Sequence, residues 1–95
     1  MADIIKEYTY RDMNNLERNL KITIKDNINI SKHEKEVVQA FSEHAQGVLF
    51  RNHLDVSKWM CDELHIPGTW KLCYTISDGY WIERMKSRRG NIIIE

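Results

Sequence analysis

The segment PGTWKLCYTISDGY, residues 67–80, decides the fold of this chain because it fits two different elements. As a strand, it alternates apolar and polar side chains. The apolar face would hold Trp70, Leu72, Tyr74 and Ile76. Asp78-Gly79 would then form a type I′ turn, and residues 80–85 would return as the second strand of a hairpin. This pairing sets Lys71 opposite Lys86, which is mildly unfavourable because like charges repel across a strand pair.

The same segment also fits a short helix over residues 67–77. Pro67 suits the first helical position, where its missing N–H costs nothing. Leu72 and Ile76 are four residues apart and would face a core. The outer side would present Lys71, Tyr74 and Thr75. In this interpretation YWIERMKS is a strand, RRGN is a turn and IIIE is the returning strand.

Two helices are predicted upstream of this segment. Ser31 and Glu34 form a capping box that opens a helix over residues 31–46. Its apolar stripe would be Val37, Val38, Phe41 and Ala45. Asp55 is the predicted N-cap of a second helix, which ends before Pro67 because the residue preceding a proline disfavours helical geometry. Residues 48–50 between them fit one more helical turn or a short buried strand.

The first 30 residues form an N-terminal extension of a helix and a strand. Residues 9–20 fit a short helix, since Thr9 and Asp12 resemble a capping box. The apolar repeat at helical spacing is Met13, Leu16 and Leu20. Residues 21–30 place every isoleucine at an even position, which indicates one long strand or a hairpin with an odd-length loop. We expect this extension to serve in dimerisation or in docking a partner.

With the helical interpretation, the order of elements resembles the winged helix-turn-helix DNA-binding domains. The residues that carry the resemblance are VSKWMCDELHIPGTWKL (56–72) and DGYWIERMKSRRGNIIIE (78–95), within a domain of residues 31–95. The resemblance implies an α+β fold: a three-helix core with a C-terminal β-hairpin, the wing, preceded by the extension of residues 1–30.

The resemblance also implies a small transcriptional regulator that binds double-stranded DNA, as a dimer on a two-fold site. Residues 67–77 would be the recognition helix in the major groove, and residues 84–91 the basic wing. From Gly79 to Ile94 there are four basic residues and one acidic residue, a local charge of +3. The implied DNA-binding residues are Lys71, Tyr74, Thr75, Arg84, Lys86, Arg88 and Arg89.

Composition keeps a second function class open. The 95 residues carry 14 basic and 14 acidic side chains, and a net charge of zero argues against a generic nucleic-acid binder. The alternative is a small inhibitor or adaptor that docks on a larger enzyme or polymerase without contacting DNA. We expect no enzymatic activity and no cofactor, because nothing resembles a phosphate loop, a glycine-rich cofactor turn or a paired-carboxylate site. We expect no metal, because Cys61 and His65, with His53 and Cys73 nearby, lack the spacing of a zinc site.

The sequence also bears on location. No apolar run approaches the length of a transmembrane helix, so no membrane association is expected. The first ten residues lack the basic and then apolar order of a signal peptide, which predicts a cytoplasmic protein. Two cysteines are too few for a disulfide scaffold and fit a reducing compartment.

Overall fold

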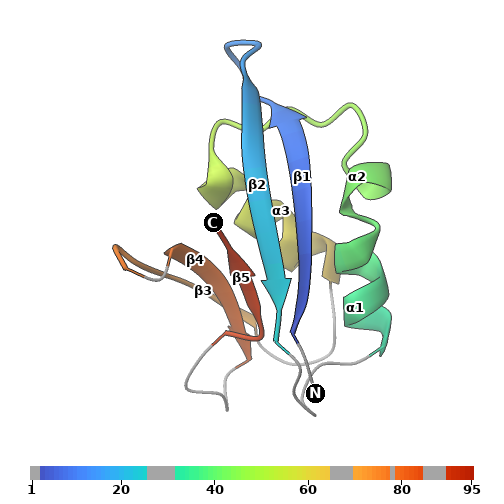
Figure 1. The fold of residues 1–95 in the computed structure, drawn as a ribbon, viewed down its shortest axis with the longest axis vertical. Helices are drawn as coiled ribbons and strands as arrows, with labels where there is room; N and C mark the ends of the chain where they lie inside the picture. The colour runs from blue at the N-terminus through green and yellow to red at the C-terminus, as the bar shows by residue number, and fades with distance from the viewer. Residues whose placement is uncertain (1–2, 26–31, 65–69, 78, 85–89) are drawn as a thin grey trace.

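The computed structural model of the chain describes residues 3–25, 32–64, 70–77, 79–84 and 90–95. These residues form a five-stranded antiparallel sheet in the order β1-β2-β5-β4-β3. The elements in chain order are β1 (Ile4–Arg11), β2 (Glu17–Ile24), α1 (Lys32–Gln39), α2 (Phe41–His44), α3 (His53–Leu64), β3 (Trp70–Thr75), β4 (Gly79–Arg84) and β5 (Ile92–Ile94). In Figure 1 the helices lie behind the sheet and beside β1, which leaves the front face of the sheet uncovered by helices.

The predicted winged-helix architecture is wrong. Residues 70–75 form the edge strand β3, which pairs antiparallel with β4 from Trp70 opposite Arg84 to Thr75 opposite Gly79. The alternation of apolar and polar residues in this segment prevails because a period of two suits a strand with one face on a core. The three helices pack on the sheet and do not form a core of their own.

The helix predicted for residues 9–20 is also wrong, because this segment is the hairpin of β1 and β2. A turn reverses the chain after Asp12, whose Oδ1 accepts the backbone N–H of Asn14 at 2.9 Å and that of Leu16 at 3.0 Å. Asn15 adopts a φ of 62°, a left-handed conformation that asparagine tolerates better than most residues. Local hydrogen bonding by an aspartate therefore closes a turn here and does not cap a helix.

The core lies between the inner face of the sheet and the helices. The even-numbered residues of the central strands supply one side of it: Leu20, Ile22, Ile24, Ile82, Ile92 and Ile94. The helices supply Val38, Phe41, Val56 and Met60. The stripe predicted at Val37, Val38, Phe41 and Ala45 is confirmed, since the first and last of these pack against the core and the middle two are buried in it. The strand face predicted at Ile22 and Ile24 is confirmed as well, whereas Ile28 and Ile30 lie outside the described residues.

The boundaries of the helices differ from the predicted ones. The helix predicted over residues 31–46 is divided at Ala40, which separates α1 from α2. α3 begins at His53, and its N-cap is Asn52 because the Asn52 Oδ1 accepts the Asp55 N–H at 3.1 Å. Asp55 lies in the first turn and binds the side chain and the backbone N–H of Arg51. Residues 48–50 form neither a helix nor a strand; only an isolated parallel bridge joins Phe50 to Asp12.

β4 and β5 pair with each other, as expected for the strands YWIERMKS and IIIE, but they do not form a projecting wing. β5 lies between β4 and β2, so it belongs to the interior of the sheet. β2, from the N-terminal part of the chain, is thereby joined to the C-terminal strands in one sheet. The basic residues predicted at the tip of the wing, Lys86, Arg88 and Arg89, lie outside the described part of the chain. Among the helices that the structure describes, none has the length and apolar character needed to cross a membrane.

Candidate functional site: a groove at the free edge of β1

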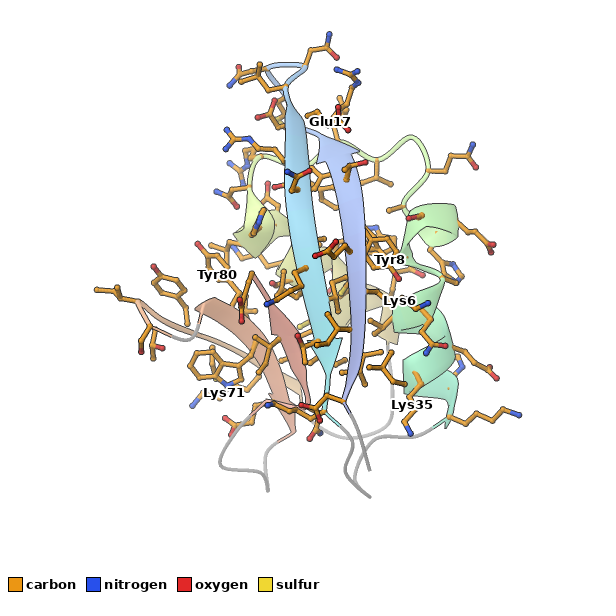
Figure 2. All side chains as sticks on the ribbon, in the orientation of Figure 1. Lys6, Tyr8, Glu17, Lys35, Lys71 and Tyr80 are labelled. Carbon is orange, nitrogen blue, oxygen red and sulfur yellow. The ribbon has the colours of Figure 1, made fainter. Side chains whose placement is uncertain are left out.

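The structure separates the three residues predicted to share a recognition helix. Lys71 and Thr75 have odd numbers and lie on the open face of the sheet, whereas Tyr74 lies on the opposite face and stacks on Tyr80 with ring centroids 4.6 Å apart. Lys71 is paired with Glu83 on the neighbouring strand. Figure 2 shows Lys71 and Tyr80 on the β3–β4 side of the molecule, away from Lys6 and Tyr8. The prediction that Lys71, Tyr74 and Thr75 form one surface is therefore wrong.

The remaining predicted DNA-binding residues belong to β4 and the segment after it. Arg84 ends β4, with its Cα opposite that of Trp70. Lys86, Arg88 and Arg89 lie outside the described residues. Their role at a basic tip stays a prediction.

The open face of the sheet is not a basic surface in the part of the chain that the structure describes. Two pairs of opposite charge lie on it: Lys25 Nζ is 3.5 Å from Asp3 Oδ2, and Lys21 Nζ is 3.5 Å from Glu95 Oε2. Exposed pairs of this kind contribute little stability, but their opposite charges cancel and so do not create the positive potential that attracts a phosphate backbone. Among the described residues of this face, these pairs do not add up to a basic patch.

The nucleophilic side chains are poorly placed for chemistry. Burial raises the pKa of the Cys61 thiol to about 11, and burial together with the Glu83 carboxylate raises the pKa of Cys73. Both thiols are therefore protonated at neutral pH, and the thiolate is the reactive form. Ser57 is fully buried and donates its hydroxyl to the carbonyl of His53. Within the described residues there is no cluster of three metal-binding side chains.

The free edge of β1 carries a more specific arrangement, which follows from the direction of backbone groups. The N–H and C=O of Lys21 both bond to Glu95, so the odd residues of β2 face β5 and its even residues face β1. Their partners in β1 are also even-numbered. The odd residues of β1, including Thr9 and Arg11, consequently direct their N–H and C=O groups out of the sheet.

Other elements limit this edge at two points. The Tyr8 hydroxyl donates to the carbonyl of Gln39 at 2.9 Å and lies 3.2 Å from that of Val38, which fastens the end of α1 to β1. Beyond Arg11, the bridge between Asp12 and Phe50 brings the chain back to the edge. Three residues, 9–11, remain open between these points, a length of roughly 10 Å at the rise of a strand.

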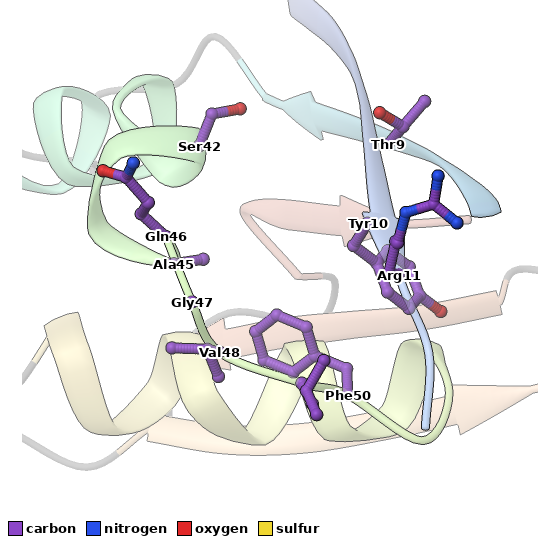
Figure 3. A pocket seen from close by; sticks show the side chains of 10 residues that line it. Thr9, Tyr10, Arg11, Ser42, Ala45, Gln46, Gly47, Val48 and Phe50 are labelled. Atoms are coloured by element: carbon purple, nitrogen blue, oxygen red, sulfur yellow. The ribbon is translucent and has the colours of Figure 1, made fainter. Parts of the chain in front are cut away.

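A groove of about 310 Å³ occupies this open length (Figure 3). β1 forms one wall, and α2 with the segment that follows it forms the other. The lining residues are Thr9, Tyr10, Arg11, Ser42, Ala45, Gln46, Gly47, Val48, Leu49 and Phe50. Two of them, Val48 and Leu49, expose 36% and 59% of their surface, so apolar side chains are available at the wall.

Gly47 and Phe50 explain why the sequence builds this wall. Gly47 has a φ of 81°, which ends the helical segment as glycines do at helix C-termini, and the Val48 N–H donates to the Ala45 carbonyl at 3.0 Å. The chain then runs toward the end of β1. Phe50 is buried and packs edge-to-face on Tyr10, with ring centroids 5.6 Å apart. The buried aromatic side chains hold the groove in shape without a ligand.

The polar chemistry of the groove is simple. Arg11 is its one charged lining residue, and its Nη1 donates to the carbonyl of Asn15 at 3.0 Å. Thr9, Ser42 and Gln46 add uncharged groups that donate and accept hydrogen bonds. Sequence reasoning missed this site because its walls are more than thirty residues apart in the chain; the only local signal was a glycine followed by the apolar run VLF.

Comparison with known proteins adds no family to this description: a scan of protein-family models and searches of curated proteins and of solved structures found no match to this chain.

Proposed function

We propose that this chain is a small protein-binding module that takes up an extended segment of a larger protein in the groove beside β1. The observation that carries the proposal is the direction of the Thr9 and Arg11 backbone groups, which face a hollow with apolar side chains on its far wall. Addition of a strand to a free sheet edge is a recurring mode of peptide recognition, in which the main chain supplies affinity and side-chain pockets supply specificity.

The chemistry of the walls defines the segment that would fit. Two edge residues can form up to four backbone hydrogen bonds, each contributing about 1 kcal/mol net. Val48 and Leu49 favour an apolar side chain on the ligand, and the Arg11 guanidinium favours a carboxylate. Because only three edge residues are open and the volume is at the small end of ligand sites, about 300–1,000 Å³, we expect micromolar affinity for an isolated peptide.

A peptide titration followed by NMR tests the proposal. The probes are blocked peptides of about eight residues in which apolar and acidic residues alternate, the pattern that an added strand would present to the groove. We expect saturable amide shifts at residues 9–11 and 46–50. Val48→Asp places a charge in the apolar wall and should abolish them. Ile76→Asp, a matched change at a side chain that is 95% exposed on the opposite edge, should leave them intact.

Two outcomes would refute the proposal. One is the absence of shifts at the groove up to millimolar peptide. The other is binding that Val48→Asp leaves unchanged. Arg11→Glu adds a test of the ligand's charge: it should weaken acidic peptides and strengthen their lysine-substituted counterparts, since the guanidinium is replaced by a carboxylate.

DNA binding stays a prediction with less support, since residues 70–75 form a strand and supply no recognition helix. A fluorescence anisotropy titration against duplex DNA at several salt concentrations tests it directly. Binding that weakens on Arg88→Ala with Arg89→Ala, and whose salt slope flattens by up to about two units, would favour the DNA function over the peptide-binding function.

A further inference from the structure

The opposite edge of the sheet, β3, is also open, and the same backbone reasoning applies to it. The Ile82 carbonyl accepts the Asn91 N–H at 2.9 Å, so the even residues of β4 face β5 and its odd residues face β3. In β3 the odd residues are therefore bonded to β4. Leu72 and Tyr74 direct their N–H and C=O groups away from the sheet. Within the described residues no strand lies beyond them.

This edge lacks the features that keep a strand from pairing with another chain. Natural sheets protect edge strands with several charges, prolines or bulges. The strand WKLCYT carries a single charge, Lys71, and its register with β4 is regular along all six residues. Tyr74 exposes 56% of its surface, and Ile76, just beyond the strand, exposes 95%. Among the described residues, this edge is therefore mostly apolar, and no strand pairs with its outer side.

We propose that β3 pairs with β3 of a second copy of this chain, antiparallel and centred on Cys73. In this register Leu72 lies opposite Tyr74 of the second copy, and Tyr74 opposite its Leu72. Both residues direct their backbone groups outward, so the two pairs supply four hydrogen bonds across the two-fold axis.

Side-chain matching supports both the partner and the register. Leu72 meets Tyr74 on the helix side of the sheet, which covers an exposed aromatic ring. Lys71 meets the uncharged Thr75 on the open side, whereas a shift to a centre on Lys71 would place two lysines directly opposite. A two-fold pairing is isologous and closes on itself, so assembly stops at two copies. At the β1 edge, α1 and Phe50 limit the open length to three residues, which is shorter than the six residues of β3.

The proposed dimer places the two Cys73 residues directly opposite each other. They form a pair without mutual backbone hydrogen bonds, for which the Cα atoms lie about 4.5 Å apart. That separation falls within the range of a disulfide, about 4.4–6.8 Å. The Cys73 Sγ lies 3.6 Å from Glu83 Oε2 and donates to it, and its pKa is raised, so the bond needs alkaline pH and an added oxidant. Diamide supplies the oxidant: it takes up the two electrons and two protons that the thiols lose.

The experiment combines mass measurement with cross-linking. Sedimentation velocity over a wide range of protein concentration should show the mass rise from one chain to two. Tyr74→Lys should return the protein to one chain, because it places a cation opposite Leu72 of the second copy. Met13→Lys, a matched change at a similarly exposed side chain near the β1–β2 turn, should not. Diamide at about pH 9 should cross-link Cys61→Ser but not Cys73→Ser. Circular dichroism confirms that the variants are folded.

Each contrary result overturns a defined part of the proposal. A mass of one chain at every concentration overturns the dimer. A dimer that Tyr74→Lys leaves intact overturns the β3 interface, and a dimer lost on Tyr74→Lys but never cross-linked through Cys73 overturns the register. Because the β1 groove lies at the other edge of the sheet, Tyr74→Lys should still bind peptides there, so failure of the dimer and failure of the proposed function are separately visible.

Discussion

The hydroxyl of Tyr10 lies 2.8 Å from Nδ1 of His53, a contact that ties β1 to the first residue of α3. Burial is the main cause that lowers the pKa of His53, and the nearby Arg18 charge lowers it further. A neutral imidazole with its proton on Nε2 accepts a hydrogen bond from the Tyr10 hydroxyl, whereas a ring with a proton on Nδ1 donates one to it, so the contact can form in either state. Burial is therefore what favours the neutral form of the histidine.

This relationship predicts how stability depends on pH. Since the pKa of His53 is lower in the folded state than its ordinary value of about 6.5, the unfolded chain binds the proton more readily. The free energy of unfolding should be at its full value above about pH 6.5 and fall as the pH drops through the folded pKa. Urea denaturation between about pH 7.5 and 5 measures the fall. His53→Gln should flatten it; an unchanged slope in that variant would assign the dependence to another group.

A second prediction concerns Asp12, whose carboxylate accepts hydrogen bonds from Asn14, Leu16 and the Arg18 Nε, the last at 2.8 Å. The hydrogen bond from Arg18 is the first cause that lowers the pKa of Asp12. The stabilisation by the ionised Asp12 carboxylate should therefore be fully present above about pH 3.8, and it should be lost as the pH falls through the lower pKa that Asp12 has in the folded state.

Asp12→Asn should lower the urea midpoint and remove this acid-dependent loss, because the amide keeps the size of the side chain but not its charge. Asp55→Asn is the matched control, since Asp55 also accepts hydrogen bonds from an arginine and from a backbone N–H, but its side chain is 19% exposed. We expect the urea midpoint to fall further for Asp12→Asn, because the Asp12 side chain is only 2% exposed. Equal midpoints for the two variants would contradict a structural role for the buried carboxylate.

Features that repeat along one element were predictable from the sequence. The even-numbered isoleucines of β2 and the stripe of Val38 and Phe41 are buried as their spacing indicates. Because one face of each element is buried, its apolar side chains recur with the period of that element, so their spacing indicates the secondary structure.

The helix predicted over residues 9–20 shows why capping signals mislead. Thr9 and Asp12 have the spacing of a capping box, but short polar side chains close turns by the same bonds that cap helices. Met13 and Leu16, whose spacing suggested a core stripe, are 60% and 56% exposed in the turn. The alternative signal, Tyr8 and Tyr10 two residues apart on a strand, was present in the same stretch.

The error at β3 has a different origin. The local alternation of residues 70–76 favoured a strand, but the order of elements along the chain resembled a winged helix and favoured the helical interpretation. The sheet order places β5 between β2 and β4, a pairing across about seventy residues that no local pattern encodes. The turn was also misjudged: Thr75 pairs with Gly79, so three residues and not two separate the paired positions. Lys71 is consequently opposite Glu83 and not opposite Lys86.

The last prediction contrasts two glycines that are required for different reasons. A Cβ at Gly90 would lie 2.6 Å from Cγ of Trp81 and 2.7 Å from the Ile82 carbonyl oxygen, so the indole and the strand leave no room for a side chain. A Cβ at Gly47 would meet nothing within 4 Å, but its φ of 81° is strained for any other residue. Gly90→Ala should lower the free energy of unfolding by about 1–3 kcal/mol because of overpacking, and Gly47→Ala should lower it by about 1–2 kcal/mol because of backbone strain.

A second substitution separates the two causes. In a Trp81→Leu background the cost of Gly90→Ala should shrink, because part of the clash is with the indole, and the remaining cost reflects the Ile82 carbonyl. The cost of Gly47→Ala should be the same in both backgrounds, since no atom of Trp81 lies near it. Urea denaturation of the four variants and their parents completes the cycle. If Gly90→Ala costs as much with leucine at position 81 as with tryptophan, the indole is not the group that excludes a side chain, and the packing of Trp81 on Gly90 does not fix the turn into β5.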